Sequence, residues 1–121
     1  MLLPRSAWWA LFWLQVAAVT LLMLLPQPPA AADTGWDKLN HVLAFAGPCF
    51  AGLAARAGTG ARSAWRIGLG LLLFGAVLEG LQGLLPPRSP ELMDLLADAV
   101  GLLLGAALYG GARRLLRAAA A

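Results

Sequence analysis

Four long apolar stretches, separated by three short breaks, dominate this sequence of 121 residues. They cover approximately residues 7–25, 39–55, 67–85 and 92–109. Each reaches or nearly reaches the ~17–25 mainly apolar residues that a helix needs to cross a bilayer. None alternates with the period of a β-strand, and a helix satisfies its own backbone hydrogen bonds in lipid. We therefore predict an all-α fold, in which residues 1–121 form a single integral membrane bundle of four transmembrane helices ending in a short basic tail, 112–121.

The composition agrees with a surface that faces lipid, because 60% of the residues are hydrophobic and only 12% are charged. A soluble domain has about half apolar and about a quarter charged residues. The formal net charge of +3 does not indicate nucleic-acid binding, because the basic residues form no stripe with interleaved aromatic side chains. The single cysteine, Cys49, excludes an internal disulfide and a zinc site built from several cysteines.

Charged residues divide between the two sides of the predicted bundle. One side carries seven arginines and no acid: Arg5, Arg56, Arg62, Arg66, Arg113, Arg114 and Arg117. The opposite side carries all six acidic residues together with Lys38 and Arg88. Because cytoplasmic loops carry an excess of basic residues, we expect a multi-pass protein of the inner membrane with both termini in the cytoplasm. The first and third loops would then face outward.

The first apolar stretch has two interpretations. Arg5 and the run Ala30-Ala31-Ala32 are typical of a cleaved signal peptide. The stretch is longer than the ~7–15 apolar residues of a usual signal peptide, however. Three tryptophans near its start, Trp8, Trp9 and Trp13, also suit the interfacial belt of a transmembrane helix. Both interpretations stay open, and a retained span is favoured.

Polar residues on the acidic side form three clusters at helical spacing. They are Asp37-Lys38-x-x-His41, then Glu79-x-x-Gln82 followed by Arg88, and Asp94-x-x-x-Asp98-x-x-Gly101-x-x-x-Gly105. Residues three or four apart share one face of a helix, and short loops make successive spans antiparallel neighbours. The glycines favour close helix contact. We therefore expect the clusters to meet in one pocket, with these ligand-binding candidates: Asp37, Lys38, His41, Glu79, Gln82, Arg88, Asp94 and Asp98.

Less specific roles are also available to these residues. Buried ion pairs can fix the register of helices without any chemistry. Asp37 and Asp94 stand where helix N-caps are common, His41 suits a hydrogen-bonded structural role, and Asp33 and Glu91 resemble solvated loop charges. The sequence contains no phosphate-binding loop, no GxSxG and no HExxH motif, so no metal or cofactor is expected.

The order of the clusters resembles the VanZ-like family of small bacterial membrane proteins. The resemblance covers residues 33–110 and rests on Asp37-Lys38-x-x-His41, Glu79-x-x-Gln82, Arg88 and Asp94-x-x-x-Asp98-x-x-Gly101. The family usually has asparagine where this chain has Asp98. The family takes its name from a protein associated with resistance to the glycopeptide teicoplanin, and it has no settled biochemical activity. The resemblance implies a role in the cell envelope that involves lipid-linked or cell-wall material.

Three hypotheses for function follow from these observations. The first is binding of an envelope lipid or a cell-wall precursor head group in the outward pocket. In that pocket, Lys38, His41 and Arg88 would meet phosphate or carboxylate, and the other candidates would contact hydroxyl and amine groups. The second is an intramembrane hydrolase with His41 or Glu79 as base, although the only outward serine is Ser89. The third is an assembly subunit that packs Gly101 and Gly105 on another helix. The expected partners are membrane lipids, and a homo-oligomer is an open alternative.

Overall fold

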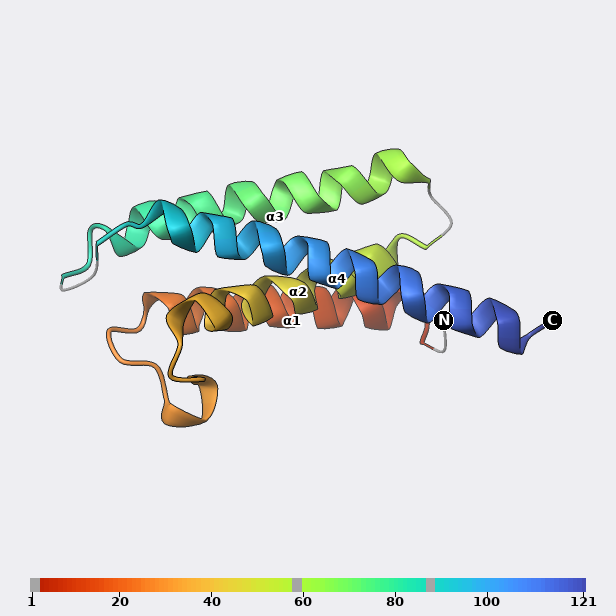
Figure 1. Ribbon diagram of the computed structural model, residues 1–121, viewed down its shortest axis with the longest axis horizontal. Helices are drawn as coiled ribbons and strands as arrows, with labels where there is room; N and C mark the ends of the chain where they lie inside the picture. The colour runs from red at the N-terminus through yellow and green to blue at the C-terminus, as the bar shows by residue number, and fades with distance from the viewer. Residues whose placement is uncertain (1–2, 58–59, 87–88) are drawn as a thin grey trace.

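The computed structural model describes residues 3–57, 60–86 and 89–121, and these form four α-helices joined by loops (Figure 1). The helices are α1 (Arg5–Leu24), α2 (Asp37–Ala55), α3 (Ala61–Gln82) and α4 (Leu92–Ala119). A short 3₁₀ turn, Ala30–Ala32, interrupts the loop between α1 and α2. The prediction of an all-α fold is confirmed.

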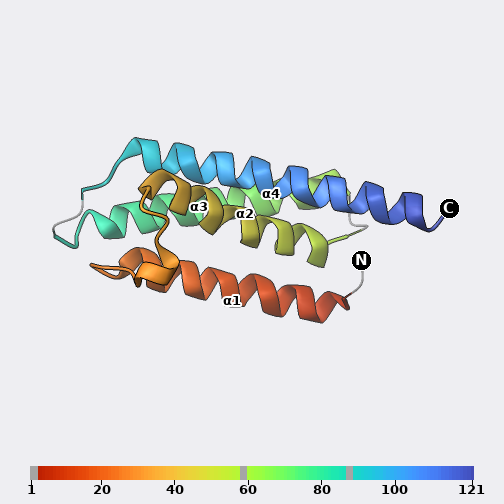
Figure 2. The ribbon, with the colours of Figure 1, turned by 60° about the horizontal axis from the view of Figure 1, so that its bottom comes forward.

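Helix α2 occupies the centre of the bundle. It packs against each of the other three helices, most extensively against α4, and Figure 2 shows it between α1 and α4. Ten of its 19 residues are buried, which is more than in any other helix. Aromatic Phe45 and the small Cys49 and Ala51 are almost fully enclosed. The hydrophobic core therefore runs along α2 and is completed by side chains such as Phe12 of α1 and Leu78 of α3.

The predicted glycine strip brings α4 against the backbone of α2. A Cβ atom at Gly101 would collide with the carbonyl oxygen of Val42, and one at Gly105 would collide with that of Ala46. Only glycine permits this approach, so the expectation of close packing is confirmed. Because α2 of the same chain covers both glycines, neither is free to contact the helix of a partner.

The glycines of α3 do not all lie at close helix contacts. Gly75 packs closely, since a Cβ there would lie 2.5 Å from Oδ2 of Asp98. In contrast, Gly68, Gly70 and Gly80 have no atom within 4 Å of the space that a Cβ would fill. These three glycines lie on the outer surface of α3.

Three predicted helix boundaries are wrong. Helix α3 begins at Ala61 instead of residue 67 and ends at Gln82 instead of residue 85. The first turn of α3 is polar and basic, so a search for long apolar stretches does not include it. After Gln82 the backbone forms turn hydrogen bonds, which end the helix. Helix α4 continues through Gly110 and Gly111 to Ala119, because the alanines, leucines and arginines that follow are strong helix formers. Much of the predicted basic tail is therefore helical.

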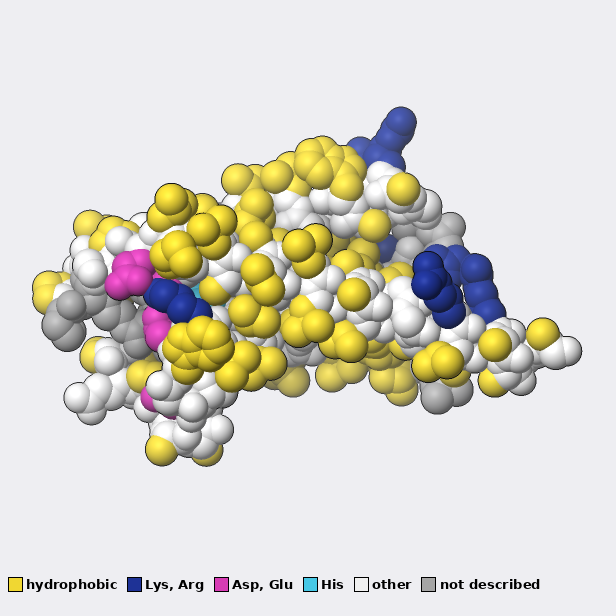
Figure 3. Space-filling view, in the orientation of Figure 1, with side chains coloured by type: hydrophobic (Ala, Val, Ile, Leu, Met, Phe, Trp, Pro, Cys, Tyr) yellow, Lys and Arg dark blue, Asp and Glu magenta, His cyan; other side chains and the backbone are white. Residues whose placement is uncertain are grey.

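Three helices, α1, α3 and α4, are long and apolar enough to cross a membrane. Large hydrophobic side chains lie exposed on all three, including Leu14, Leu73 and Leu103, and Figure 3 shows apolar side chains over most of one face. An exposed apolar surface of this extent is typical of a membrane protein. Figure 3 also separates the acidic side chains at one end of the bundle, called here the acidic end, from the arginines at the other end.

Candidate functional site

At the acidic end, the structure brings together the first turns of α2 and α4 and the last turn of α3. Seven of the eight predicted ligand-binding residues lie in this region: Asp37, Lys38, His41, Glu79, Gln82, Asp94 and Asp98. The eighth, Arg88, lies outside the described residues. The helical spacing and short loops of the sequence therefore predicted correctly which clusters meet.

The deepest part of the site is a pair formed by His41 and Asp98. Nδ1 of His41 lies 2.8 Å from Oδ1 of Asp98, and both side chains are buried. A donating Nδ1–H leaves the other ring nitrogen, Nε2, free of its proton in the neutral imidazole. Nε2 lies 3.8 Å from Oδ2 of Asp94, which is beyond hydrogen-bond distance. The contact with Asp98 thus holds the ring with Nε2 directed toward Asp94.

Asp98 is accommodated by a space that only a glycine leaves. Its side chain is 1% exposed, and its Oδ2 atom makes no hydrogen bond to any residue that the structure describes. Gly75 on α3 lies directly beside that oxygen. Within the described residues, only one of the two carboxylate oxygens of Asp98 therefore has a hydrogen-bond partner. Leaving the other oxygen buried and unpaired is energetically costly.

Lys38 is surrounded by carboxylates. Its Nζ donates hydrogen bonds to Asp94 and to Oε2 of Glu91, the latter at 2.7 Å, and lies 3.7 Å from Oδ2 of Asp37. The hydrogen bond to Asp94, followed by that to Glu91, raises the pKa of Lys38, which precedes the predicted span 39–55. The ammonium group is therefore a permanent cation that already has anionic partners.

Glu79 and Gln82 join the helices at this end. Oε1 of Glu79 accepts a hydrogen bond of 2.5 Å from the backbone N–H of Glu91, just before α4. Nε2 of Gln82 donates a hydrogen bond of 2.7 Å to the backbone carbonyl of Met23 at the end of α1. These contacts tie α3 to the end of α1 and to the residue before α4, and they give the two side chains a positioning role.

Several simpler expectations for the acidic residues are wrong. The residues at the N-caps of α2 and α4 are Trp36 and Glu91, and neither cap makes a side-chain hydrogen bond. Asp37 and Asp94 lie within the first turns instead, where a negative charge favours the helix dipole. Glu91 is not simply solvated, because it binds Lys38.

Asp33 also has a specific role, in ordering the loop before α2. Its Oδ1 accepts hydrogen bonds from the backbone N–H of Gly35 at 2.9 Å and from Nδ2 of Asn40 at 2.8 Å. The hydrogen bond from Asn40, followed by that from Gly35, lowers the pKa of Asp33. Oδ1 of Asn40 in turn accepts from the backbone N–H of Thr34 at 2.9 Å. Gly35 permits the turn with a φ of 79°.

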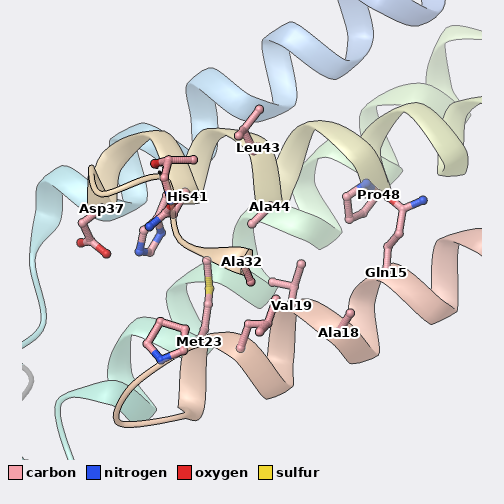
Figure 4. A pocket seen from close by; sticks show the side chains of 14 residues that line it. Gln15, Ala18, Val19, Met23, Ala32, Asp37, His41, Leu43, Ala44 and Pro48 are labelled. Carbon is pink, nitrogen blue, oxygen red and sulfur yellow. Dashed lines mark hydrogen bonds between the residues drawn. The ribbon is translucent and has the colours of Figure 1, made fainter. Parts of the chain in front are cut away.

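A pocket of about 340 Å³ opens between α1 and α2 beside this loop (Figure 4). Asp37 and His41 lie at one end of the pocket, while Gln15 of α1 lies at the other (Figure 4). Its apolar wall consists mainly of these side chains: Ala18, Val19, Leu22, Met23, Leu43 and Ala44. Thr34 and Asn40 add polar groups near Asp37. The pocket is therefore polar at the acidic end of the bundle and apolar along the helices.

Sequence reasoning missed the contribution of α1 to this pocket. Gln15 belongs to no cluster in the sequence, and helical spacing within α1 does not reveal which helix that face contacts. The sequence could have indicated Asn40 as a residue of this pocket, because it directly precedes His41 in the polar first turns of α2. Thr34 carried no signal in the sequence.

The arrangement offers two kinds of chemistry. His41 is oriented by a buried carboxylate, which is the requirement for a histidine that acts as a general base or as a metal ligand. Asp37, His41 and Asp94 each offer one ligand atom, and these atoms all lie within 4.8 Å of one another. Among the described residues, three carboxylates, those of Asp37, Glu91 and Asp94, lie within 4 Å of the ammonium group of Lys38.

Comparisons with protein-family models, with curated proteins and with solved structures found no match to this chain.

Proposed function

We propose that this chain is a four-span protein of the bacterial inner membrane that binds the head group of an envelope lipid or lipid-linked cell-wall precursor. The observation that carries the proposal is the shape of the pocket between α1 and α2. Its apolar wall runs along the helices, as an acyl or isoprenoid chain would, and its polar end holds Asp37, Asn40 and His41. The resemblance to the VanZ-like family, with its envelope context, supports the same class of ligand.

The topology follows from the lengths and charges of the helices. Helix α2 lacks an uninterrupted apolar stretch as long as those of the other three helices, but its 19 residues correspond to ~28 Å, close to the ~30 Å of a hydrocarbon core. Because the other helices surround it, α2 does not need a lipid-facing surface of its own. The arginines at one end of the bundle support an orientation with both termini in the cytoplasm and with the pocket opening toward the outer leaflet.

A matched pair of substitutions tests this pocket. Ala18 lines it, whereas Ala17, also exposed and on the same helix, does not. We expect Ala18→Phe to fill the cavity and weaken lipid binding ~5–150-fold, the equivalent of 1–3 kcal/mol of overpacking. Ala17→Phe should leave binding unchanged. Displacement of a fluorescent phospholipid from the purified protein, by phospholipids and by polyprenyl phosphates, measures both. Equal affinities of the two variants would contradict the proposal.

Hydrolysis of the bound lipid is a second candidate function, and the pair of His41 and Asp98 favours it. The pair orients Nε2 of His41 as a general base toward the polar end of the pocket, where water is accessible. Glu79 is less suited to this role, because its carboxylate accepts the backbone N–H of Glu91. Release of a water-soluble head group from the same lipids, lost in His41→Ala but retained in Ala17→Phe, would establish this activity. Absence of turnover across the lipid panel would leave binding alone.

A further inference from the structure

We propose that Asp37, His41 and Asp94 bind one divalent transition-metal ion, with Asp98 as the residue that orients His41. Zn²⁺ suits the donor set best, because it accepts imidazole nitrogen together with carboxylate oxygen. This inference goes beyond head-group binding, because the metal would be held by side chains of this protein and would not require a bound lipid. No sequence motif indicates the site, because its ligands come from two helices that are far apart in the sequence.

The distances are close to those of a metal centre. Two ligand atoms of a tetrahedral Zn²⁺ at ~2.0–2.1 Å from the metal lie ~3.4 Å apart. Nε2 of His41 and Oδ2 of Asp94 lie 3.8 Å apart, so a shift of a few tenths of an ångström would complete this pair. The third ligand requires a larger movement. Asp37 has room for this movement, because its side chain is 63% exposed.

His41 has the environment of a ligand and not only of a buried structural histidine. Its side chain is 5% exposed, yet it lines the pocket, and Nε2 receives no hydrogen bond from the residues that the structure describes. Asp98 holds Nδ1 at 2.8 Å, which fixes the tautomer whose lone pair is on Nε2. A carboxylate behind a histidine is the usual outer-shell partner of metal-bound imidazole.

The local charge also favours a cation. Three carboxylates lie within 4 Å of the Lys38 ammonium group, and a fourth, Asp98, contacts His41. Two of these four side chains, Asp94 and Asp98, are almost fully buried. Lys38 occupies Oδ1 of Asp94 and leaves Oδ2 directed at His41. A metal ion at the polar end of the pocket would add positive charge beside Asp37 and His41, with which an anionic phosphate would pair. Only this last step rests on the proposed function.

Metal binding is tested with the full chain, purified without an affinity tag and stripped with a chelator. Titration with ZnCl₂ in detergent, followed calorimetrically, should show one equivalent per chain, and bound Co²⁺ should show visible ligand-field absorption. We expect Asp37→Asn to weaken binding at least about tenfold, and Asp98→Asn to weaken it ~10–100-fold through the ring orientation. Asp33→Asn is the matched control, because it removes one nearby negative charge outside the three ligands, while the asparagine Oδ1 still accepts the hydrogen bonds from Gly35 and Asn40.

The outcomes separate this inference from the proposed function. Asp37 is exposed, so its substitution does not threaten the fold, and far-UV circular dichroism checks the folding of each variant. Absence of Zn²⁺ and Co²⁺ binding, or binding that Asp37→Asn and Asp33→Asn weaken equally, would overturn the metal site. The lipid-displacement assay, run with and without chelator, reports on the head group separately. Lipid binding that persists in chelator would leave the pocket intact and remove the metal from its mechanism.

Discussion

Replacing Gly101 with alanine tests how closely α4 approaches the backbone of α2. A Cβ at this position would collide with the carbonyl oxygen of Val42 and would lie 3.1 Å from the Cβ of Phe45. Neither atom can rotate away, because one belongs to the backbone and the other is fixed by it. The two helices must therefore move apart around the new methyl group.

The cost of this movement is opposed by a gain in helix propensity. Overpacking that shifts a backbone costs about 1–3 kcal/mol, whereas alanine is about 1 kcal/mol better than glycine inside a helix. Because the obstruction at Gly101 is backbone, we expect a net loss of about 1–2 kcal/mol in the free energy of unfolding. Gly111 of the same helix has no atom within 4 Å of its absent Cβ, so Gly111→Ala should gain about 0.5–1 kcal/mol.

Reversible unfolding of the purified protein by SDS in mixed micelles, followed by far-UV circular dichroism, gives both free energies. The two substitutions are chemically identical and lie on one helix, so their opposite signs isolate the contact with α2. If Gly101→Ala stabilised the protein as much as Gly111→Ala does, α4 would not pack on the carbonyl of Val42, and the reasoning would fail.

Three further substitutions probe the acidic end. Gly75→Ala should destabilise the protein by about 1–3 kcal/mol in the same SDS titration, because its Cβ would lie 2.5 Å from Oδ2 of Asp98; a stabilising effect would contradict this packing. Lys38→Met should strengthen Zn²⁺ binding in calorimetry, because it removes the competing cation from Asp94, and a weakened affinity would show instead that Lys38 supports the site. The lowered pKa of Asp33 means that its contribution to loop order is complete above the ordinary value near ~3.9 and is lost as the pH falls through the lowered value. Amide NMR shifts of that loop should report the transition below about pH 4, and it should be absent in Asp33→Asn.

The sequence predicts the meeting of the polar clusters because two simple rules determine it. Helical spacing puts Lys38 and His41 on one face of α2 and puts Asp94 and Asp98 on one face of α4. Short loops make the helices antiparallel, so the polar ends must coincide. The observed contact of His41 with Asp98 is the result. The same spacing also predicts the close contact at the glycines, because Gly101 lies three residues after Asp98, on the same face of α4.

Helix ends and the partners of each face could not be predicted in this way. Apolar length identifies the part of a helix that contacts lipid, so it misses the polar first turn of α3 and the continuation of α4 past Gly110 and Gly111. Spacing shows which side chains share a face but not which helix meets it. The contact of Gln82 with the end of α1, and the pocket beside Gln15, both depend on how the helices are arranged in space.

The composition of α2 explains why this helix lacks the long apolar stretch that α1, α3 and α4 each contain. Its first turns supply Asp37, Lys38 and His41 to the site, and its later turns supply the small residues and backbone carbonyls on which Gly101 and Gly105 pack. Both groups of residues lower the hydropathy of α2, because polar and small side chains stand where a lipid-facing helix would have leucine. Such a helix would be stable in a bilayer only if other helices covered it, and α1, α3 and α4 pack around it and carry exposed apolar side chains on their outer surfaces. The site and the central position of α2 are therefore two consequences of one requirement, since ionisable groups in a membrane need protein around them.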